Sequence, residues 1–143
     1  MKKTLINVFL LSMFAMYFTC MLNMTQVKAE NYALYAEKQA IIEFDTLKID
    51  FGTFSEKEGE QKCSFTFTNV GDAPLIINQA FPSCGCTVPT FTKDPVMPGE
   101  RGSIDVTYNT KGRAQGRFMK TITVRSNAKN EIVRLTIEGV MTK

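Results

Sequence analysis

The sequence predicts an all-β fold, an immunoglobulin-like antiparallel β-sandwich of about seven strands at residues 40–143. From Ala40 onward, short runs rich in Phe, Thr, Val and Ile alternate apolar with polar residues, as strands with one buried face do. Clusters of Gly, Pro, Asn and Asp interrupt these runs every ~8–12 residues, which is the spacing of short antiparallel strands. About 100 residues of this pattern suit one sandwich domain.

Residues 1–29, which precede this domain, have the pattern of a secretory signal peptide. The chain opens with Lys2-Lys3, and residues 8–22 are almost entirely apolar. Val27-Lys28-Ala29 then ends in a small residue. We predict cleavage after Ala29, and therefore an exported protein of the periplasm or cell envelope.

Two alternatives to cleavage stay open. The signal could remain as a membrane anchor, which is disfavoured because its apolar run falls short of the ~20 residues of a spanning helix. A lipid could instead be attached at Cys20, although the preceding Tyr17-Phe18-Thr19 is bulkier than lipoprotein signals usually are. We expect membrane contact only in these two cases.

The net charge of the chain comes from this segment. The formal charge is +3, and removal of residues 1–29 deletes Lys2, Lys3 and Lys28 but no acidic residue, so the remainder is neutral. A neutral chain gives no reason to expect nucleic acid as a partner. The sequence has no phosphate-binding loop either, and we expect no cofactor and no small-molecule substrate.

The first elements of the mature chain follow in order. Residues 30–39 read as a linker or short N-terminal segment. Residues 41–44 and 47–51 are expected to supply an opening strand pair, and Gly52 breaks the alternation where a bulge would lie. The next strand alternates strictly, so we expect a single buried face made of Cys63, Phe65 and Phe67.

The remaining elements follow a dense turn sequence at 69–74. A strand is expected from Leu75-Ile76-Ile77, and Pro98-Gly99 suits the centre of a type II turn. Later buried faces are Ile104, Val106 and Tyr108, then Phe118, Ile122 and Val124, and last the strand 132–140; loops are expected at 109–116 and 127–130. Because Trp is absent and no later strand carries a cysteine, an antibody-type disulfide between the sheets is excluded.

The order of these motifs resembles a known bacterial family. They are Ile49-Asp50-Phe51-Gly52, FTFTNVGDAPL at 65–75, Ser83-Cys84-Gly85-Cys86-Thr87, Pro98-Gly99-Glu100 and Leu135-Thr136-Ile137-Glu138-Gly139. Together they resemble domain-of-unknown-function family 1573, which is similar to immunoglobulin-like domains of the major-sperm-protein and cilia-associated type. The resemblance implies a secreted or envelope β-sandwich and no established activity. Cys84 and Cys86 match the family's paired cysteines, whereas Cys63 stands where an ordinary apolar residue is expected.

The pair Cys84 and Cys86 is the strongest candidate for chemistry. In an extended strand their Cα atoms would lie ~6.6 Å apart, close to the disulfide limit of ~6.8 Å. Such a bond would be strained and easily reduced, unless Gly85 lets the backbone turn. Redox exchange also needs a thiol pKa lowered by a cation or helix N-terminus, and the nearest cation along the chain is Lys93.

A structural bridge is the reading we favour for the cysteines. A bond from Cys63 to Cys84 or Cys86 would close a loop of about 20 residues and stabilise the fold by ~3 kcal/mol. We expect Cys63 to be the best partner, on a strand of the opposite sheet, which leaves one free thiol. Metal binding is less favoured, because the mature chain offers three cysteines, no histidine and only Met97 as a further sulfur ligand.

Other charged clusters are expected to be solvated. Catalysis by Ser-His-Asp or Cys-His is excluded because the chain has no histidine. The acidic residues Glu56, Glu58 and Glu60 and the basic residues Lys111, Arg113, Arg117 and Lys120 each gather around a turn. We therefore expect a non-enzymatic module that contacts an envelope protein by strand addition at a sheet edge. The alternative is a thiol–disulfide or Cu(I)-handling protein that uses Cys84 and Cys86.

Overall fold

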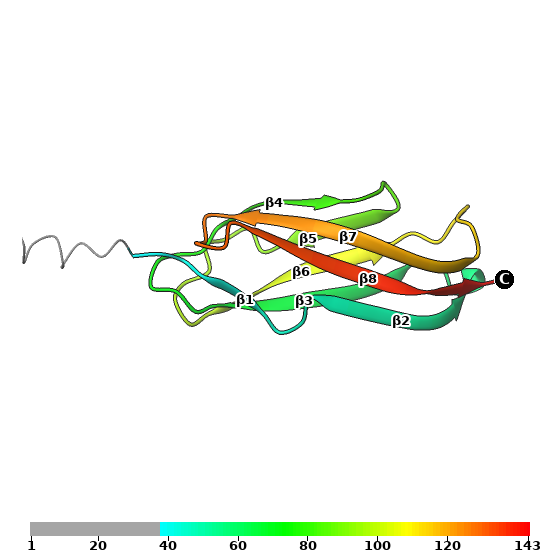
Figure 1. Ribbon diagram of the computed structural model, residues 1–143, viewed down its shortest axis with the longest axis horizontal. Helices are drawn as coiled ribbons and strands as arrows, with labels where there is room; N and C mark the ends of the chain where they lie inside the picture. The colour runs from blue at the N-terminus through cyan, green and yellow to red at the C-terminus, as the bar shows by residue number, and fades with distance from the viewer. Residues whose placement is uncertain (1–37) are drawn as a thin grey trace, which may run out of the picture. The chain divides into compact units, whose positions relative to one another are not determined.

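The computed structural model describes residues 38–143, which form a β-sandwich of two four-stranded sheets (Figure 1). One sheet has the strand order β1-β3-β6-β5 and the other β2-β8-β7-β4. The strands are β1 (Ile42–Phe44), β2 (Lys48–Ser55), β3 (Gln61–Asn69), β4 (Ile77–Pro82), β5 (Thr87–Phe91), β6 (Arg101–Tyr108), β7 (Gly116–Ser126) and β8 (Ile132–Thr142), with a 3-10 turn at Glu56–Glu58. The immunoglobulin-like fold is confirmed, with eight strands.

The core lies between the sheets and follows the alternation of the sequence. Phe65 and Phe67 of β3 are fully buried against the inward residues of β6, β7 and β8. Those inward residues include Ile104, Val106, Tyr108, Ile122, Val124, Leu135 and Ile137. Cys63 is half-buried and packs against the same core, so its predicted inward direction is confirmed.

The two opening segments do not pair with each other, contrary to expectation. β1 pairs antiparallel with β3, whereas β2 pairs parallel with β8 in the other sheet. The turn between them therefore carries the chain from one sheet to the other. Gly52 lies where the β2–β8 register shifts and has a φ of 67°, which confirms the predicted bulge.

Two later elements also differ from expectation. Leu75 forms an isolated bridge with Val96, and the strand begins only at Ile77. Residues 87–91 form β5, although Pro89 makes this segment a poor strand in sequence. Because β5 is an edge strand of its sheet, a proline is tolerated there.

The predicted signal peptide, its cleavage after Ala29 and Cys20 lie outside the described residues, as does most of the segment 30–39. Among residues 38–143, no helix is long and apolar enough to cross a membrane.

Candidate functional site

The cysteine pair lies in the connection between β4 and β5, which links an edge strand of one sheet to an edge strand of the other. The connection turns: the Thr87 N–H donates to the Cys84 carbonyl at 3.2 Å, and the Asn109 N–H donates to the Cys86 carbonyl at 2.7 Å. The turn brings the Cα atoms of Cys84 and Cys86 to 5.3 Å, and their sulfurs are joined as a disulfide. The extended geometry considered from sequence is therefore wrong, and the alternative of a turn at Gly85 is the one that the structure contains.

The two sulfurs of this loop differ in exposure but share one hydroxyl. Cys86 is only 2% exposed, whereas Cys84 is half-buried. Thr87, 1% exposed, places its Oγ1 3.7 Å from the Cys84 sulfur and 3.8 Å from the Cys86 sulfur. A buried hydroxyl beside both sulfurs can donate a hydrogen bond to whichever sulfur carries negative charge.

Cys63 does not pair with the loop cysteines in the structure. β3, which carries Cys63, and β5, which follows Cys86, are in the same sheet with β6 between them. Two strand spacings amount to ~9.5 Å, which exceeds the ~6.8 Å that a disulfide spans between Cα atoms. The expectation that these cysteines face each other from opposite sheets is wrong.

The Cys63 thiol is held in its protonated form. Burial, and then the nearby Asp105 carboxylate, raise its pKa from 9.0 to about 11. Both causes disfavour the thiolate, which is the reactive species. The surroundings of Cys63 therefore suit packing better than chemistry.

We expect Cys63 to react with iodoacetamide about 100-fold more slowly in the native protein than in urea at pH 8, because a rise of two pKa units lowers the thiolate fraction by about that factor. Mass spectrometry of the Cys63 peptide measures the rate without interference from other cysteines. Equal rates in the folded and unfolded protein would contradict the protonated, half-buried thiol.

The free edge of β1 is closed at Ile42 by a side chain from the other sheet. The Val70 N–H donates to the Ile41 carbonyl, so the backbone groups of the next residue, Ile42, face away from β3. Asn130, in the turn before β8, accepts from the Ile42 N–H at 3.2 Å and donates to its carbonyl at 2.8 Å. One amide side chain thus occupies both edge groups of Ile42.

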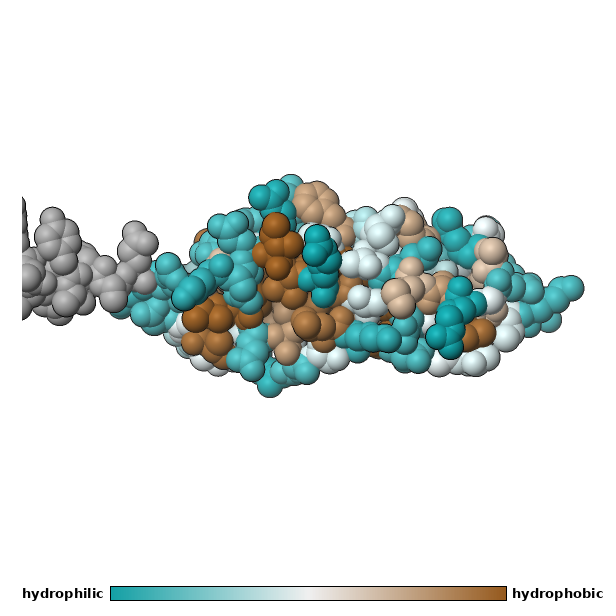
Figure 2. Space-filling model, viewed as in Figure 1, coloured by the Kyte–Doolittle hydropathy of each residue, from teal (hydrophilic) through white to brown (hydrophobic). Residues whose placement is uncertain are grey.

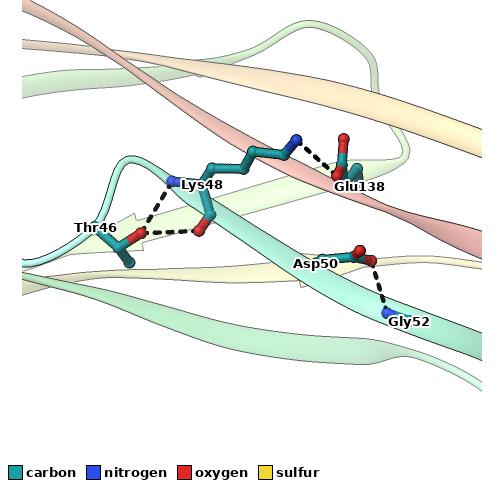
Figure 3. Close-up of polar contacts among 5 residues, drawn as sticks. All are labelled: Thr46, Lys48, Asp50, Gly52 and Glu138. Atoms are coloured by element: carbon teal, nitrogen blue, oxygen red, sulfur yellow. Dashed lines mark hydrogen bonds and ion pairs between the residues drawn. The ribbon is translucent and has the colours of Figure 1, made fainter.

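The free edge of β2 is closed in a similar way (Figure 3). The Thr46 hydroxyl donates to the Lys48 carbonyl at 2.9 Å and accepts from the Lys48 N–H at 3.3 Å. Asp50 accepts from the Gly52 N–H at 2.8 Å, while the Lys48 ammonium pairs with Glu138 of β8 at 2.7 Å. The Thr46 hydroxyl thus occupies both edge groups of Lys48.

Prolines protect the edges on the opposite side, where β4 and β5 run (Figure 1). The Asn109 N–H donates to the Cys86 carbonyl, so the backbone groups of Cys86 face β6. Because this direction alternates along an antiparallel strand, the backbone groups of Pro89, three residues later, face away from β6. The Ser83 N–H donates to the Thr121 carbonyl, which likewise turns Pro82 away from β7. Since proline has no N–H, each edge lacks a donor at its centre or end.

The start of β8 carries a stretch of strand edge that neither a proline nor a side-chain hydrogen bond occupies within the described residues. The Ser126 N–H donates to the Glu131 carbonyl, so the backbone groups of Ile132 and Arg134 face away from β7. β2 reaches this side of β8 only from Thr136, whose N–H donates to the Leu47 carbonyl. Within residues 38–143, the backbone groups of Ile132 and Arg134 therefore have no neighbouring strand on that side.

Apolar side chains lie beside this open edge. Ile132 is 53% exposed, and Leu47, which precedes β2, is 52% exposed. Figure 2 shows hydrophobic residues gathered over the half of the visible face where β1 and the start of β8 lie. We call this stretch, Ile132–Arg134 with the Leu47 side chain, the β8 notch.

The other predicted groups are dispersed. Glu58 accepts from the Ser55 N–H to cap the 3-10 turn, and the basic cluster remains at the β6–β7 connection and the start of β7. Met97 precedes β6, and Cys86 bonds to Asn109, which follows β6. The two residues therefore lie near opposite ends of β6, and the structure does not bring Met97 to the cysteines. No group of three His, Cys, Asp or Glu that could hold a metal occurs in the described part of the chain.

The edge-closing contacts are the part of the site that sequence reasoning missed. Asn130 closes the edge at Ile42 across 88 positions of sequence, so no local pattern reveals it. Pro82 and Pro89, which lie on either side of the cysteine motif, were the available signal.

Comparison with solved structures is consistent with this sandwich. A protein of unknown function from Porphyromonas gingivalis W83 aligns with a TM-score of 0.65 and 16% identity, over 76% of this chain and 50% of that chain. The PapD-like domain 7 of human CEP192 aligns with a TM-score of 0.54 and 13% identity, over 73% and 87%. The periplasmic chaperone SfaE aligns with a TM-score of 0.52 and 10% identity, over 71% and 58%. At such identities the likeness shows the fold alone.

Sequence comparison identifies the family. No curated protein sequence matches the chain. The family described as Protein of unknown function (DUF1573) matches residues 42–141, which is more than half of the chain and nearly all of its sandwich. The chain belongs to the DUF1573 family.

Proposed function

We propose that this protein is an exported, non-enzymatic module that acts by protein–protein contact in the cell envelope, and that an extended segment of its partner protein adds to the β8 notch. The observation that carries the proposal is the difference between the edges. Side chains or prolines occupy part of each of the other four strand edges, whereas neither occupies the edge at Ile132 and Arg134, whose backbone groups have no neighbouring strand on that side within residues 38–143.

The geometry of the notch fits strand addition. An added strand gains main-chain hydrogen bonds from the edge and side-chain contacts from residues beside it. The exposed Ile132 and Leu47 side chains supply apolar surface for such contacts. Because the open stretch is only three residues long, we expect a weak or transient complex that depends on these apolar contacts.

Two further features support the proposal. The pattern of residues 1–29 supports export, with Cys20 lipidation as the alternative attachment. The fold is also similar to that of the periplasmic chaperone SfaE, and that likeness concerns architecture only. Immunoglobulin-like sandwiches serve many functions, so the contact surface must be tested directly.

The test is site-specific photo-crosslinking in cells that express the protein naturally. We expect a crosslinker at Leu47 to capture an extended segment of a partner, and one at Thr66, on the outer face of the other sheet, to capture little. Arg134→Pro removes the edge N–H without touching the β7–β8 ladder, and should abolish the adduct at Leu47.

Arg134→Ala is the matched control, because it removes the same side chain but keeps the N–H, and it should retain the adduct. Equal loss in both variants would assign the contact to the arginine side chain and contradict strand addition. Equal capture at positions 47 and 66 would contradict a specific surface.

A further inference from the structure

We infer that the β4–β5 connection is a thiol–disulfide exchange site at which a low-molecular-weight thiol attacks Cys84, while Thr87 stabilises the departing Cys86 thiolate. This inference concerns a different part of the molecule from the β8 notch and is independent of the proposed contact function. It rests on the asymmetry of the two sulfurs and on the position of one buried hydroxyl.

Exposure selects the sulfur that is attacked. Exchange requires an incoming thiolate to approach one sulfur of the bond. Cys84 is half-buried and adjoins the exposed Gly85, at which an added Cβ would meet no atom within 4 Å. Cys86 is 2% exposed. An external thiolate therefore reaches Cys84, and Cys86 becomes the leaving group.

Stabilisation of the departing thiolate must come from nearby. Burial disfavours the charged form of Cys86. The Thr87 hydroxyl, 3.8 Å from the Cys86 sulfur, can donate to it, and the structure gives this hydroxyl no hydrogen-bonding partner within residues 38–143 other than the two sulfurs. Lys93, the cation considered from sequence, lies over the Phe91 ring with its ammonium 3.6 Å from the ring centroid.

The Thr87 contact should strengthen as the bond breaks. A disulfide sulfur is a weak acceptor, whereas a thiolate accepts a charge-assisted hydrogen bond. The hydroxyl therefore favours the reduced form and the transition state that leads to it more than the disulfide. It acts through the leaving sulfur, so Thr87 is a positioning residue.

The chemistry balances as two exchanges. In the first, the external thiolate forms a bond to the Cys84 sulfur, the Cys84–Cys86 bond breaks, and its electron pair leaves on Cys86, which takes a proton from water. In the second, another external thiolate attacks the external sulfur of the mixed disulfide and releases Cys84 as a thiolate, which takes a proton from water. The protein disulfide is reduced to a dithiol and two external thiols are oxidised to one disulfide.

The flanking prolines favour a small thiol over a polypeptide. A polypeptide that brought a cysteine to this loop by strand pairing would find one edge donor missing on each side, at Pro82 and at Pro89. A small thiol needs access to one sulfur only. We therefore assign the site to low-molecular-weight thiols.

The experiment uses the full chain in a Cys63→Ala background, with reduced glutathione as the probe, acid quenching and mass spectrometry. We expect glutathione on Cys84, with little on Cys86. Thr87→Val should slow the first exchange about tenfold, while Thr87→Ser, which keeps the hydroxyl, should react within twofold of the parent. A cysteine-containing decapeptide should react no faster than glutathione.

A second measurement separates a chemical role of Thr87 from a structural one. In the reduced protein, thiolate absorbance near 240 nm should show a higher Cys86 pKa in Thr87→Val than in Thr87→Ser. Glutathione on Cys86, an unchanged rate in Thr87→Val, or a peptide that reacts at least tenfold faster than glutathione would overturn the inference. If Thr87→Val fails to fold, the inference is overturned by a first exchange in Thr87→Ser that is much slower than in the parent, or by the absence of any glutathione adduct in the parent.

Discussion

Asn69→Ala is expected to lower the free energy of unfolding by about 3 kcal/mol, because it removes a buried amide that satisfies several backbone groups. Asn69 is fully buried at the end of β3. Its Nδ2 donates to the carbonyls of Ala73 and Val96 at 2.8 and 2.9 Å, and its Oδ1 accepts from the Gly71 N–H at 3.0 Å. Alanine would leave the Ala73 carbonyl and the Gly71 N–H without this partner.

Asn127→Ala is the control for this prediction. Asn127 also bridges two backbone groups, the Ile76 N–H and the Pro74 carbonyl, but its bonds are exposed to solvent. Water can replace such a side chain, so we expect a loss of about 1 kcal/mol or less. Urea unfolding of both variants measures the difference. Equal losses would mean that burial of the Asn69 amide does not decide its effect.

Gly71→Ala is expected to destabilise the protein by about 3 kcal/mol or more, because an added methyl group would collide with rigid backbone. A Cβ at this position would lie 2.2 Å from the Gln39 carbonyl oxygen and 2.5 Å from the Ile41 nitrogen. Neither atom can rotate away as the end of a side chain could. The segment before β1 would therefore have to separate from the turn after β3.

Gly85→Ala provides the matched comparison, because a Cβ there meets no atom within 4 Å and the backbone needs no positive φ. We expect a change within about 0.5 kcal/mol. Thermal unfolding followed by circular dichroism measures both variants. A Gly71→Ala protein as stable as Gly85→Ala would show that the segment before β1 does not pack against Gly71.

The fold could be predicted from sequence because local patterns determine most of it. The alternation of Cys63, Phe65 and Phe67 predicts a strand with one buried face, and all three side chains face the core. The assignment of strands to sheets depends on contacts distant in sequence. Parallel pairing of β2 with β8 joins the two ends of the domain, so the opening segments look like a local hairpin but are not one.

The candidate site was less predictable for the same reason. The motif around Gly85 marks the loop, yet the sheet order decides that Cys63 lies two strands away from it. The open edge of β8 arises because β1 belongs to the other sheet and the chain joins β8 only at β2. The residue pattern within one strand does not show at which residue its neighbouring strand begins or ends.

Residue-resolved amide hydrogen exchange of the full chain tests the central claim, that β8 keeps an open edge at Ile132 and Arg134. The register predicts slow exchange at Val133 and Leu135, which bond to β7, and protection of Ile42 by Asn130. The Ile132 and Arg134 amides should exchange quickly, although they belong to one of the two longest strands. Protection of Ile132 and Arg134 equal to that of Val133 and Leu135 would contradict the open edge and the proposed function built on it.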